Sequence, residues 1–178
     1  SLPLMFLGYS FIDSFFEMMS LITTTGLTTL PDVPILKSLN FWRAFIAWVG
    51  GIGIIFIAYF GLMNSEILNT KKIVKAEGHD LIHQNPKKTT REFGLLYIGL
   101  TVLGIVALII AGVDLFSAST FTMSAISTTG HRQPGDFSYL QFTAVQIIIS
   151  LIMIIGATSF FTHYFAIKNK SIKEYFRD

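Results

Sequence analysis

The chain has 178 residues, of which 52% are hydrophobic and only 13% are charged, and its formal net charge is +2. A mean hydropathy of +0.60 lies outside the range of soluble domains and indicates an integral membrane protein. The absence of cysteine excludes a disulfide framework, a thiolate metal site and a cysteine nucleophile.

The chain opens with an apolar stretch, residues 1–12, which Pro3 and Gly8 break into a surface turn. A helical pattern follows over residues 13–21, with Asp13 or Ser14 as its expected cap rather than as ion ligands. At about 1.5 Å per residue this helix covers about 14 Å, less than half of a hydrocarbon core. We therefore expect it to enter the bilayer without crossing it.

A hydroxyl-rich run, Ile22–Thr29, follows this short helix and contains Gly26. It has an echo further along the chain: the eight residues ending at Gly26 match the eight ending at Gly130 at six positions, 104 residues apart. This similarity predicts an internal repeat.

The first full membrane crossing is predicted at residues 41–63. Its single charge, Arg43, is expected to snorkel to the interface or to hydrogen-bond loop carbonyls. Three glycines near its centre, Gly50, Gly51 and Gly53, favour close packing or a bend.

A long polar segment, residues 64–92, carries most of the lysines and is expected to be cytoplasmic by the positive-inside rule. It could also dock a cytoplasmic partner or anionic lipid. His79 and His83 are four residues apart within it, but no clear third ligand accompanies them, so we do not expect a metal site.

The second crossing, residues 93–113, carries no charge. Asp114 or Ser117 is then expected to cap a second short helix over residues 115–126, as a helix cap rather than an ion ligand. In the polar turn beyond Gly130, Arg132 either repels cations or pairs with Asp136, and we favour the pair.

The third crossing, about residues 139–167, is interrupted by Gly156, Ala157, Thr158 and Ser159 and is followed by a basic tail. His163 near its inner end is either a proton relay or, as we favour, an interfacial side chain with its hydrogen bonds satisfied.

Both lysine-rich segments lie on one side of the membrane only if each short helix and its loop enter and leave by the opposite face. Irregular backbone at that depth must be buried in protein or line a cavity. We therefore predict an all-α membrane protein with transmembrane helices and re-entrant pore-helix/filter loops, in repeats of helix–P-loop–helix type.

A hydroxyl run that ends in glycine can direct successive backbone carbonyls at a dehydrated monovalent cation. Gly26 and Gly130 would supply the unusual dihedral angles, and the short helices would direct the negative ends of their dipoles at the ion. The alternative is that these runs are helix-packing surfaces, which are common in membrane helices.

The repeated unit, together with the sequence from Phe41 to Gly53, closely resembles the Trk, Ktr and HKT superfamily of potassium transporters. In that family four unequal repeats surround one pore. The resemblance assigns residues 1–64 to a second repeat without its outer helix, 65–92 to a cytoplasmic linker, 93–168 to a complete third repeat and 169–178 to a cytoplasmic tail.

The resemblance implies a set of site residues, with glycine as the potassium-preferring form of the filter. The residues from 156 to 159 correspond to the place where the third inner helix of the family unwinds into an intramembrane gate. One departure is the sequence His131–Pro134, where the family usually has a second glycine and Phe-Ser. The implied filter residues are Thr24, Thr25, Gly26, Thr128, Thr129 and Gly130.

Two loops are half of a four-part ring, so the remaining repeats must come from a longer parent or a homodimer must form. We expect a multi-pass protein of the prokaryotic plasma membrane, and the resemblance implies that it carries K⁺ and meets regulatory nucleotide-binding subunits on its cytoplasmic face. The chain has no nucleotide-binding motif of its own, and neither nucleic acid nor a further metal is expected. Passive and ion-coupled transport both stay open.

Two other function classes compete with a cation pathway. A non-conducting scaffold would need Gly26 and Gly130 for folding only. A membrane enzyme would use Ser159 and His163, but no acidic residue inside the membrane would orient the histidine.

Overall fold

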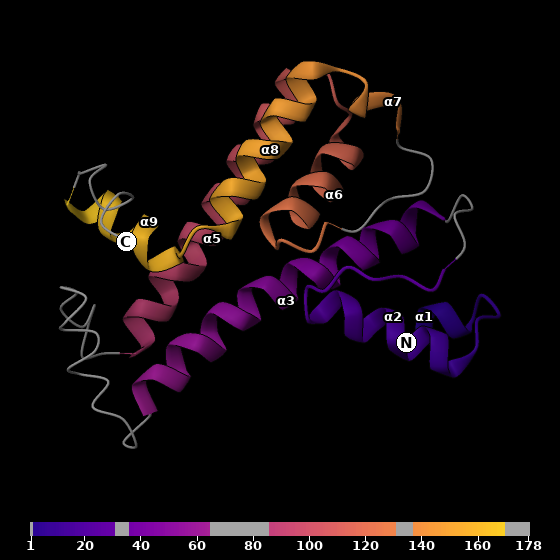
Figure 1. The fold of residues 1–178 in the computed structure, drawn as a ribbon, viewed down its shortest axis with the longest axis horizontal. Coiled ribbons are helices and arrows are strands. Elements are labelled where there is room, and N and C mark those ends of the chain that lie inside the picture. The colour runs from indigo at the N-terminus through magenta and orange to yellow at the C-terminus, as the bar shows by residue number, and fades with distance from the viewer. Residues whose placement is uncertain (1, 31–35, 65–85, 131–136, 170–178) are drawn as a thin grey trace. The chain divides into compact units, whose positions relative to one another are not determined.

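The computed structural model describes residues 2–30, 36–64, 86–130 and 137–169, and all regular structure within these ranges is α-helical (Figure 1). The predicted all-helical fold is confirmed. Three expectations lie outside the described residues: the turn with Arg132 and Asp136, the pair His79 and His83, and the tail beyond residue 169.

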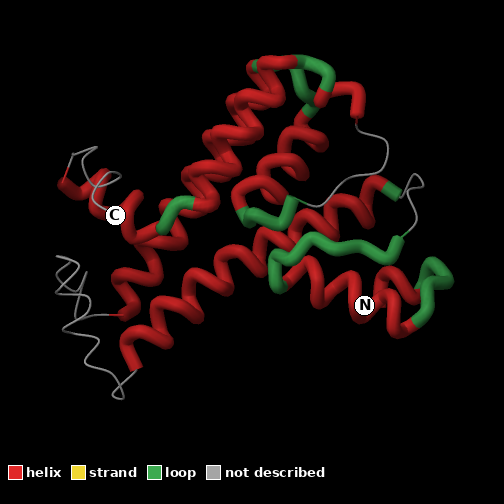
Figure 2. Tube along the Cα trace, viewed as in Figure 1, coloured by secondary structure: helices red, strands yellow, loops and turns green. Residues whose placement is uncertain are grey.

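The chain folds into two compact units, one of residues 1–51 and 99–159 and the other of residues 52–98 and 160–178. Both hydroxyl-rich loops and both short helices belong to the first unit. The green segments in Figure 2 mark these loops and the break near the end of the third predicted crossing.

The first unit begins with α1 (Leu2–Met5) and the short helix α2 (Phe11–Ile22). The predicted cap of α2 was wrong by three residues or more, because Ser10 caps the helix: its hydroxyl oxygen accepts a hydrogen bond from the amide of Asp13 at 3.1 Å. A side-chain bond from Ser10 to the Asp13 carboxylate explains the error, because both residues take part in the cap.

Two long helices follow the order expected from the sequence. Helix α3 (Lys37–Asn64) has 28 residues, and α5 (Pro86–Ile110) begins seven residues before the predicted second crossing. Among the described residues, one stretch, Arg91–Ile110, is both long and apolar enough by composition to cross a membrane.

The second short helix, α6 (Leu115–Ile126), has the predicted bounds, and Asp114 caps it through hydrogen bonds from the amides of Phe116 and Ser117 at 3.0 and 3.2 Å. The third predicted crossing is divided into α7 (Phe137–Leu140), α8 (Thr143–Ala157) and α9 (Phe160–Asn169).

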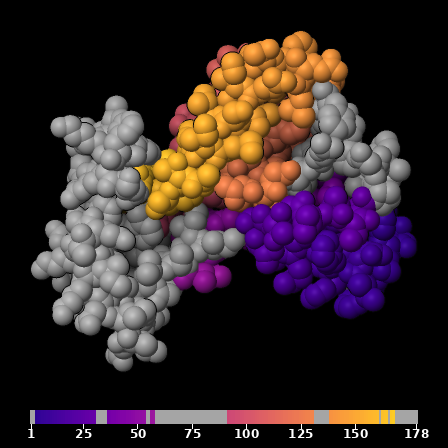
Figure 3. Space-filling view, viewed as in Figure 1, coloured from indigo at the N-terminus to yellow at the C-terminus, as the bar shows by residue number. Residues whose placement is uncertain are grey.

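Packing in the first unit places α6 against both α5 and α8. A methyl group on Gly104 of α5 would lie 2.7 Å from Thr122 on α6 and 3.0 Å from Ile152 on α8, so the three helices meet at this glycine. In the space-filling view the orange surface of α8 covers part of α6 (Figure 3).

The second unit contains an aromatic cluster built by the start of α5 and by α9. The rings of Phe93 and Tyr164 meet edge to face at 5.8 Å between centroids, and those of Tyr97 and Phe160 lie tilted to each other at 5.6 Å. Phe93 and Tyr97 are fully buried, so these contacts form the core of the unit.

Candidate functional site

The two hydroxyl-rich loops have the same backbone conformation. Thr24 and Thr128, which are equivalent in the repeat, are the two non-glycine residues with positive φ among those described, at 54° and 58°. Gly26 and Gly130 follow with φ of 77° and 61°. Left-handed backbone at a β-branched residue costs about 1–2 kcal/mol and is a feature of functional sites.

The amide groups of the first loop point back into the helix that precedes it. The N–H groups of Thr25 and Gly26 both donate to the carbonyl of Ser20, at 2.8 and 3.3 Å, and that of Thr24 donates to Leu21 at 3.0 Å. Convergence of successive amides on one acceptor is what alternating right- and left-handed residues produce.

The second loop repeats this pattern. The amide of Thr128 donates to Ala125 at 3.0 Å, and that of Gly130 donates to Ser124 at 3.2 Å. In both loops, therefore, backbone donors are used to satisfy the free carbonyls at the end of a short helix.

The carbonyl groups of the loops are left without such partners. Within the described part of the chain, none of the predicted filter residues, two threonines and one glycine in each loop, accepts a hydrogen bond on its carbonyl oxygen. Thr129 is buried and Thr24 and Gly26 are half-buried, whereas Thr25, Thr128 and Gly130 are exposed; a buried or half-buried carbonyl normally finds a donor. Six carbonyls without one form a set of oxygen ligands suited to a cation.

The side-chain hydroxyls are tied within each loop. The hydroxyls of Thr23 and Thr25 lie 2.9 Å apart, as do those of Ser127 and Thr129. Each pair joins alternate residues, so these hydroxyls brace the loop; the carbonyls of the predicted filter residues and the hydroxyls of Thr24 and Thr128 have no partner among the described residues.

The short helices add a favourable field. Helices α2 and α6 have 12 residues each, and both lead directly into their loops, so the negative end of each dipole adjoins the unpaired carbonyls. At about 1.5 Å per residue each helix is about 18 Å long, which agrees with the expectation of half-membrane elements.

The two loops touch each other. A methyl group on Gly26 would overlap the carbonyl oxygen of Thr129 and lie 3.2 Å from its carbonyl carbon. Gly26 is thus required for its left-handed backbone and for the space that the second loop occupies. No such contact surrounds Gly130, where a methyl group would have no described atom within 4 Å.

A second pair of glycines supports the ends of the short helices. A methyl group on Gly50 of α3 would overlap the carbonyl oxygen of Ile22, and one on Gly156 of α8 would lie 2.6 Å from that of Ile126. Ile22 and Ile126 are the last residues of α2 and α6. Each short helix therefore ends on a glycine of the helix that follows its loop.

The expectation for Arg43 was wrong in both of its forms. Its side chain is 2% exposed and its Nη2 lies 2.5 Å from Oε1 of Glu17, a fully buried residue of α2. Glu17 was missed because the two residues are 26 positions apart and only packing of α2 on α3 joins them.

The predicted gate segment is only partly irregular. Gly156 and Ala157 are the last two residues of α8, and the helix is interrupted at Thr158, whose backbone is extended, and Ser159. The interruption falls two residues later than predicted because the Thr158 amide still bonds to Ile154 and Ile155, which completes the last turn of α8.

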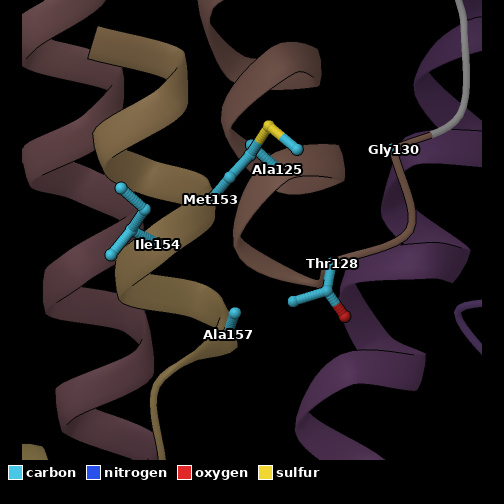
Figure 4. A pocket seen from close by; sticks show the side chains of 6 residues that line it. All are labelled: Ala125, Thr128, Gly130, Met153, Ile154 and Ala157. Carbon is cyan, nitrogen blue, oxygen red and sulfur yellow. The ribbon is translucent and has the colours of Figure 1, made fainter. Parts of the chain in front are cut away.

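A cavity of about 290 Å³ lies between the second loop and the end of α8. Figure 4 shows Ala157 and Thr128 facing each other across it, and Met153 and Ala125 also line it. The lining of the cavity is almost entirely apolar. The cavity extends from the second loop to Ala157, the last residue of α8 before the interruption.

The remaining candidates do not build a second site. His163 is buried in the second unit, where its ring meets Phe160 edge to face at 5.7 Å. Among the described residues no group of three His, Cys, Asp or Glu side chains could hold a metal ion.

Comparison with known proteins matches residues 2–177 to a family model described as TrkH, cation transport protein. An uncharacterized cation transporter of Methanocaldococcus jannaschii is 32% identical over 96% of this chain and 35% of its own length. The Trk system potassium uptake protein TrkH of Escherichia coli is 29% identical over 93% of this chain and 36% of its own length.

The fold has a counterpart among solved structures. The crystal structure of the potassium transporter TrkH from Vibrio parahaemolyticus matches with a TM-score of 0.73 and 29% identity, over 96% of this chain and 35% of that protein. The chain thus spans about a third of the length of the relatives it matches.

Proposed function

The chain belongs to the TrkH family of cation transport proteins, and we propose that it forms half of a potassium-conducting pore in which two loops coordinate the ion through backbone carbonyls. The proposed ligands are the carbonyl oxygens of Thr24, Thr25 and Gly26, and of the equivalent residues in the second loop, which are Thr128, Thr129 and Gly130.

The observation that carries this proposal is the division of polar groups in the loops. The amide bonds of both loops end on carbonyls of the short helices, and the hydroxyls of Thr23 and Thr25, and of Ser127 and Thr129, pair with each other, whereas the carbonyls of the proposed ligands have no donor within the described residues. A ring of carbonyls can replace the hydration shell of K⁺. Glycine at the end of each loop allows this conformation without a side chain in the lumen.

The interruption at Thr158 and Ser159 is the proposed gate. The backbone at Thr158 is extended, so α8 ends there, next to the apolar cavity beside the second loop. A short segment that swings across this level would close the path for an ion while leaving the filter itself intact.

The partners follow from the same proposal. Two loops require two more, either from further repeats of a parent chain or from a second copy, and we propose that the basic segments face the cytoplasm and meet regulatory nucleotide-binding subunits there. The relatives bear the names of transporters and not of enzymes. This agrees with the sequence analysis, which did not favour a catalytic role for Ser159 and His163.

A matched pair of glycines tests the filter assignment. Gly130 and Gly112 both have left-handed backbone, with φ of 61° and 91°, and a methyl group on either would have no described atom within 4 Å. Alanine is strained at both residues, and more so at Gly112, whose φ lies outside the small left-handed region that L residues adopt, so Gly112→Ala is a stringent control for backbone strain. Gly112 lies just beyond the end of α5, outside the loops.

The assay is rubidium and sodium uptake by potassium-uptake-deficient cells that express the complete gene with each variant, at equal protein level in the membrane. We expect Gly130→Ala to lower rubidium uptake and the rubidium-to-sodium ratio, and Gly112→Ala to change neither. A non-conducting scaffold predicts that both variants leave uptake intact at wild-type protein level, which would overturn the assignment.

A further inference from the structure

A polar cluster with a buried centre joins the first short helix, the segment that leaves the first loop and the start of α3. Glu17 and Arg43 form its centre, with side chains that are 0% and 2% exposed and 2.5 Å between Oε1 and Nη2. In a membrane protein, ionisable side chains that are buried within the protein are candidates for a functional site.

The cluster reaches the loop through Thr28. Its hydroxyl donates to Oε2 of Glu17 at 2.9 Å and lies 3.5 Å from Nη2 of Arg43, and it accepts a hydrogen bond from the amide of Leu30 at 3.1 Å. Thr28 is two residues beyond Gly26, so the chain that leaves the loop is attached to both charges of the pair.

A second hydrogen bond holds Leu27, the residue between Gly26 and Thr28. The hydroxyl of Ser20 on α2 donates to the carbonyl of Leu27 at 2.6 Å, while the Ser20 carbonyl accepts the amides of Thr25 and Gly26. Both sides of Gly26 are thus fixed to the same short helix, upstream through backbone bonds and downstream through Ser20 and Glu17.

The direction of the helices fits this arrangement. Glu17 contacts Arg43 and Ile22 contacts Gly50, so α2 and α3 run in the same direction along their interface. Glu17 lies five residues before the end of α2, beside Thr28 in the segment that leaves the loop.

The second repeat has no equivalent pair. The residue 104 positions after Glu17 is Phe121, and α8, whose Gly156 corresponds to Gly50, carries no charged residue. Ser124 keeps the position of Ser20. The charged cluster is therefore specific to the first repeat, and the shared fold of the two repeats does not require it.

From this geometry we infer that Glu17, Arg43 and Thr28 are positioning residues that set the orientation of the carbonyls of Thr24–Gly26 and thereby the cation selectivity of the first loop. This inference rests on the proposed function. A buried pair gives weak stabilisation compared with apolar residues of the same volume, so a role in geometry accounts for its presence better than a role in stability.

Thr28→Val tests the inference with little change in volume, because it removes the hydroxyl and leaves the ion pair. Thr29→Val is the matched control, since the Thr29 hydroxyl has no hydrogen-bond partner among the described residues. Thr28→Ser keeps the hydroxyl and serves as the conservative rescue. Each variant is expressed from the complete gene, and rubidium and sodium uptake are measured at equal membrane protein level.

We expect Thr28→Val to lower the rubidium-to-sodium ratio by roughly fivefold, the effect of one hydrogen bond on an equilibrium. Thr28→Ser and Thr29→Val should keep the wild-type ratio. The double variant Glu17→Met with Arg43→Met should lower the ratio as Thr28→Val does, although its packing volume is preserved.

An unchanged ratio in Thr28→Val and in the double variant would overturn the inference, as would a loss of protein level with the ratio preserved. Gly130→Ala separates this failure from failure of the filter assignment. If Gly130→Ala lowers the ratio and Thr28→Val does not, the filter stands and the positioning role falls; if neither does, the filter assignment falls first.

Discussion

The contact between Gly50 and the end of α2 gives a sharp stability prediction. A methyl group at residue 50 would overlap the carbonyl oxygen of Ile22 and lie 2.7 Å from its carbonyl carbon and 2.9 Å from its Cα. These are backbone atoms next to the first loop, so they cannot yield without moving that loop. Overpacking of this kind costs about 1–3 kcal/mol.

A control on the same helix isolates that cost. Gly53 is three residues further along α3, and a methyl group there would have no described atom within 4 Å. Alanine at either residue gains about 1 kcal/mol of helix propensity. Gly53→Ala should therefore be more stable than wild type, and the difference between the two variants should equal the overpacking cost.

The measurement is thermal unfolding of the detergent-solubilised protein, followed by intrinsic fluorescence or by size-exclusion chromatography after heating. Gly50→Ala should unfold at a lower temperature than Gly53→Ala and should lose rubidium uptake. Equal unfolding temperatures in the two variants would refute the close contact between Gly50 and Ile22 and the reasoning built on it.

Three further predictions concern the second repeat and the contact between the loops. Gly26→Ala should abolish rubidium uptake, whereas Gly130→Ala only reduces it, because the methyl group at residue 26 overlaps the carbonyl of Thr129; equal uptake by the two variants would contradict this contact. Asp114→Ala should lower the thermal stability at pH 7 by about 1 kcal/mol through loss of the helix cap, and a variant as stable as wild type at pH 7 would contradict the capping role. The pKa of Asp114 is lowered from 3.8, chiefly by a hydrogen bond from Ser117, so the advantage of wild type is present above the ordinary carboxyl pKa and disappears as the pH falls through the lowered one, which unfolding curves at successive pH values would detect. Ala157→Leu should partly fill the cavity of about 290 Å³ beside Thr128 and reduce uptake at unchanged protein level, and normal uptake would argue against an open path there.

The sequence predicted the elements whose signals are local. Helix α6 was placed at its observed bounds because Asp114 is a strong cap and a hydroxyl-rich loop follows Ile126. Helix α2 was placed less well, because Ser10, Asp13 and Ser14 all favour a cap and only the hydrogen bonds distinguish them.

The features that were not predicted from the sequence depend on contacts between residues far apart in the chain, or on backbone conformations that the local residue type disfavours. Threonine disfavours positive φ, so nothing in the residue type indicated the left-handed backbone of Thr24 and Thr128. The pairing of Glu17 with Arg43 depends on how α2 packs on α3, which a single sequence does not reveal. The family resemblance named the proposed filter residues, but not the contact of Gly26 with Thr129.

If the loops bind the transported ion as proposed, their unpaired carbonyls link that ion to the stability of the protein. An empty filter would leave oxygens whose own loops offer no donor among the described residues, so water or an ion must solvate them. A ligand that binds only the folded state stabilises it by RT ln(1 + [L]/Kd). Under the proposed function, the ion that passes through the pore would also be a component of the folded structure, and the loops would be most ordered when potassium is abundant.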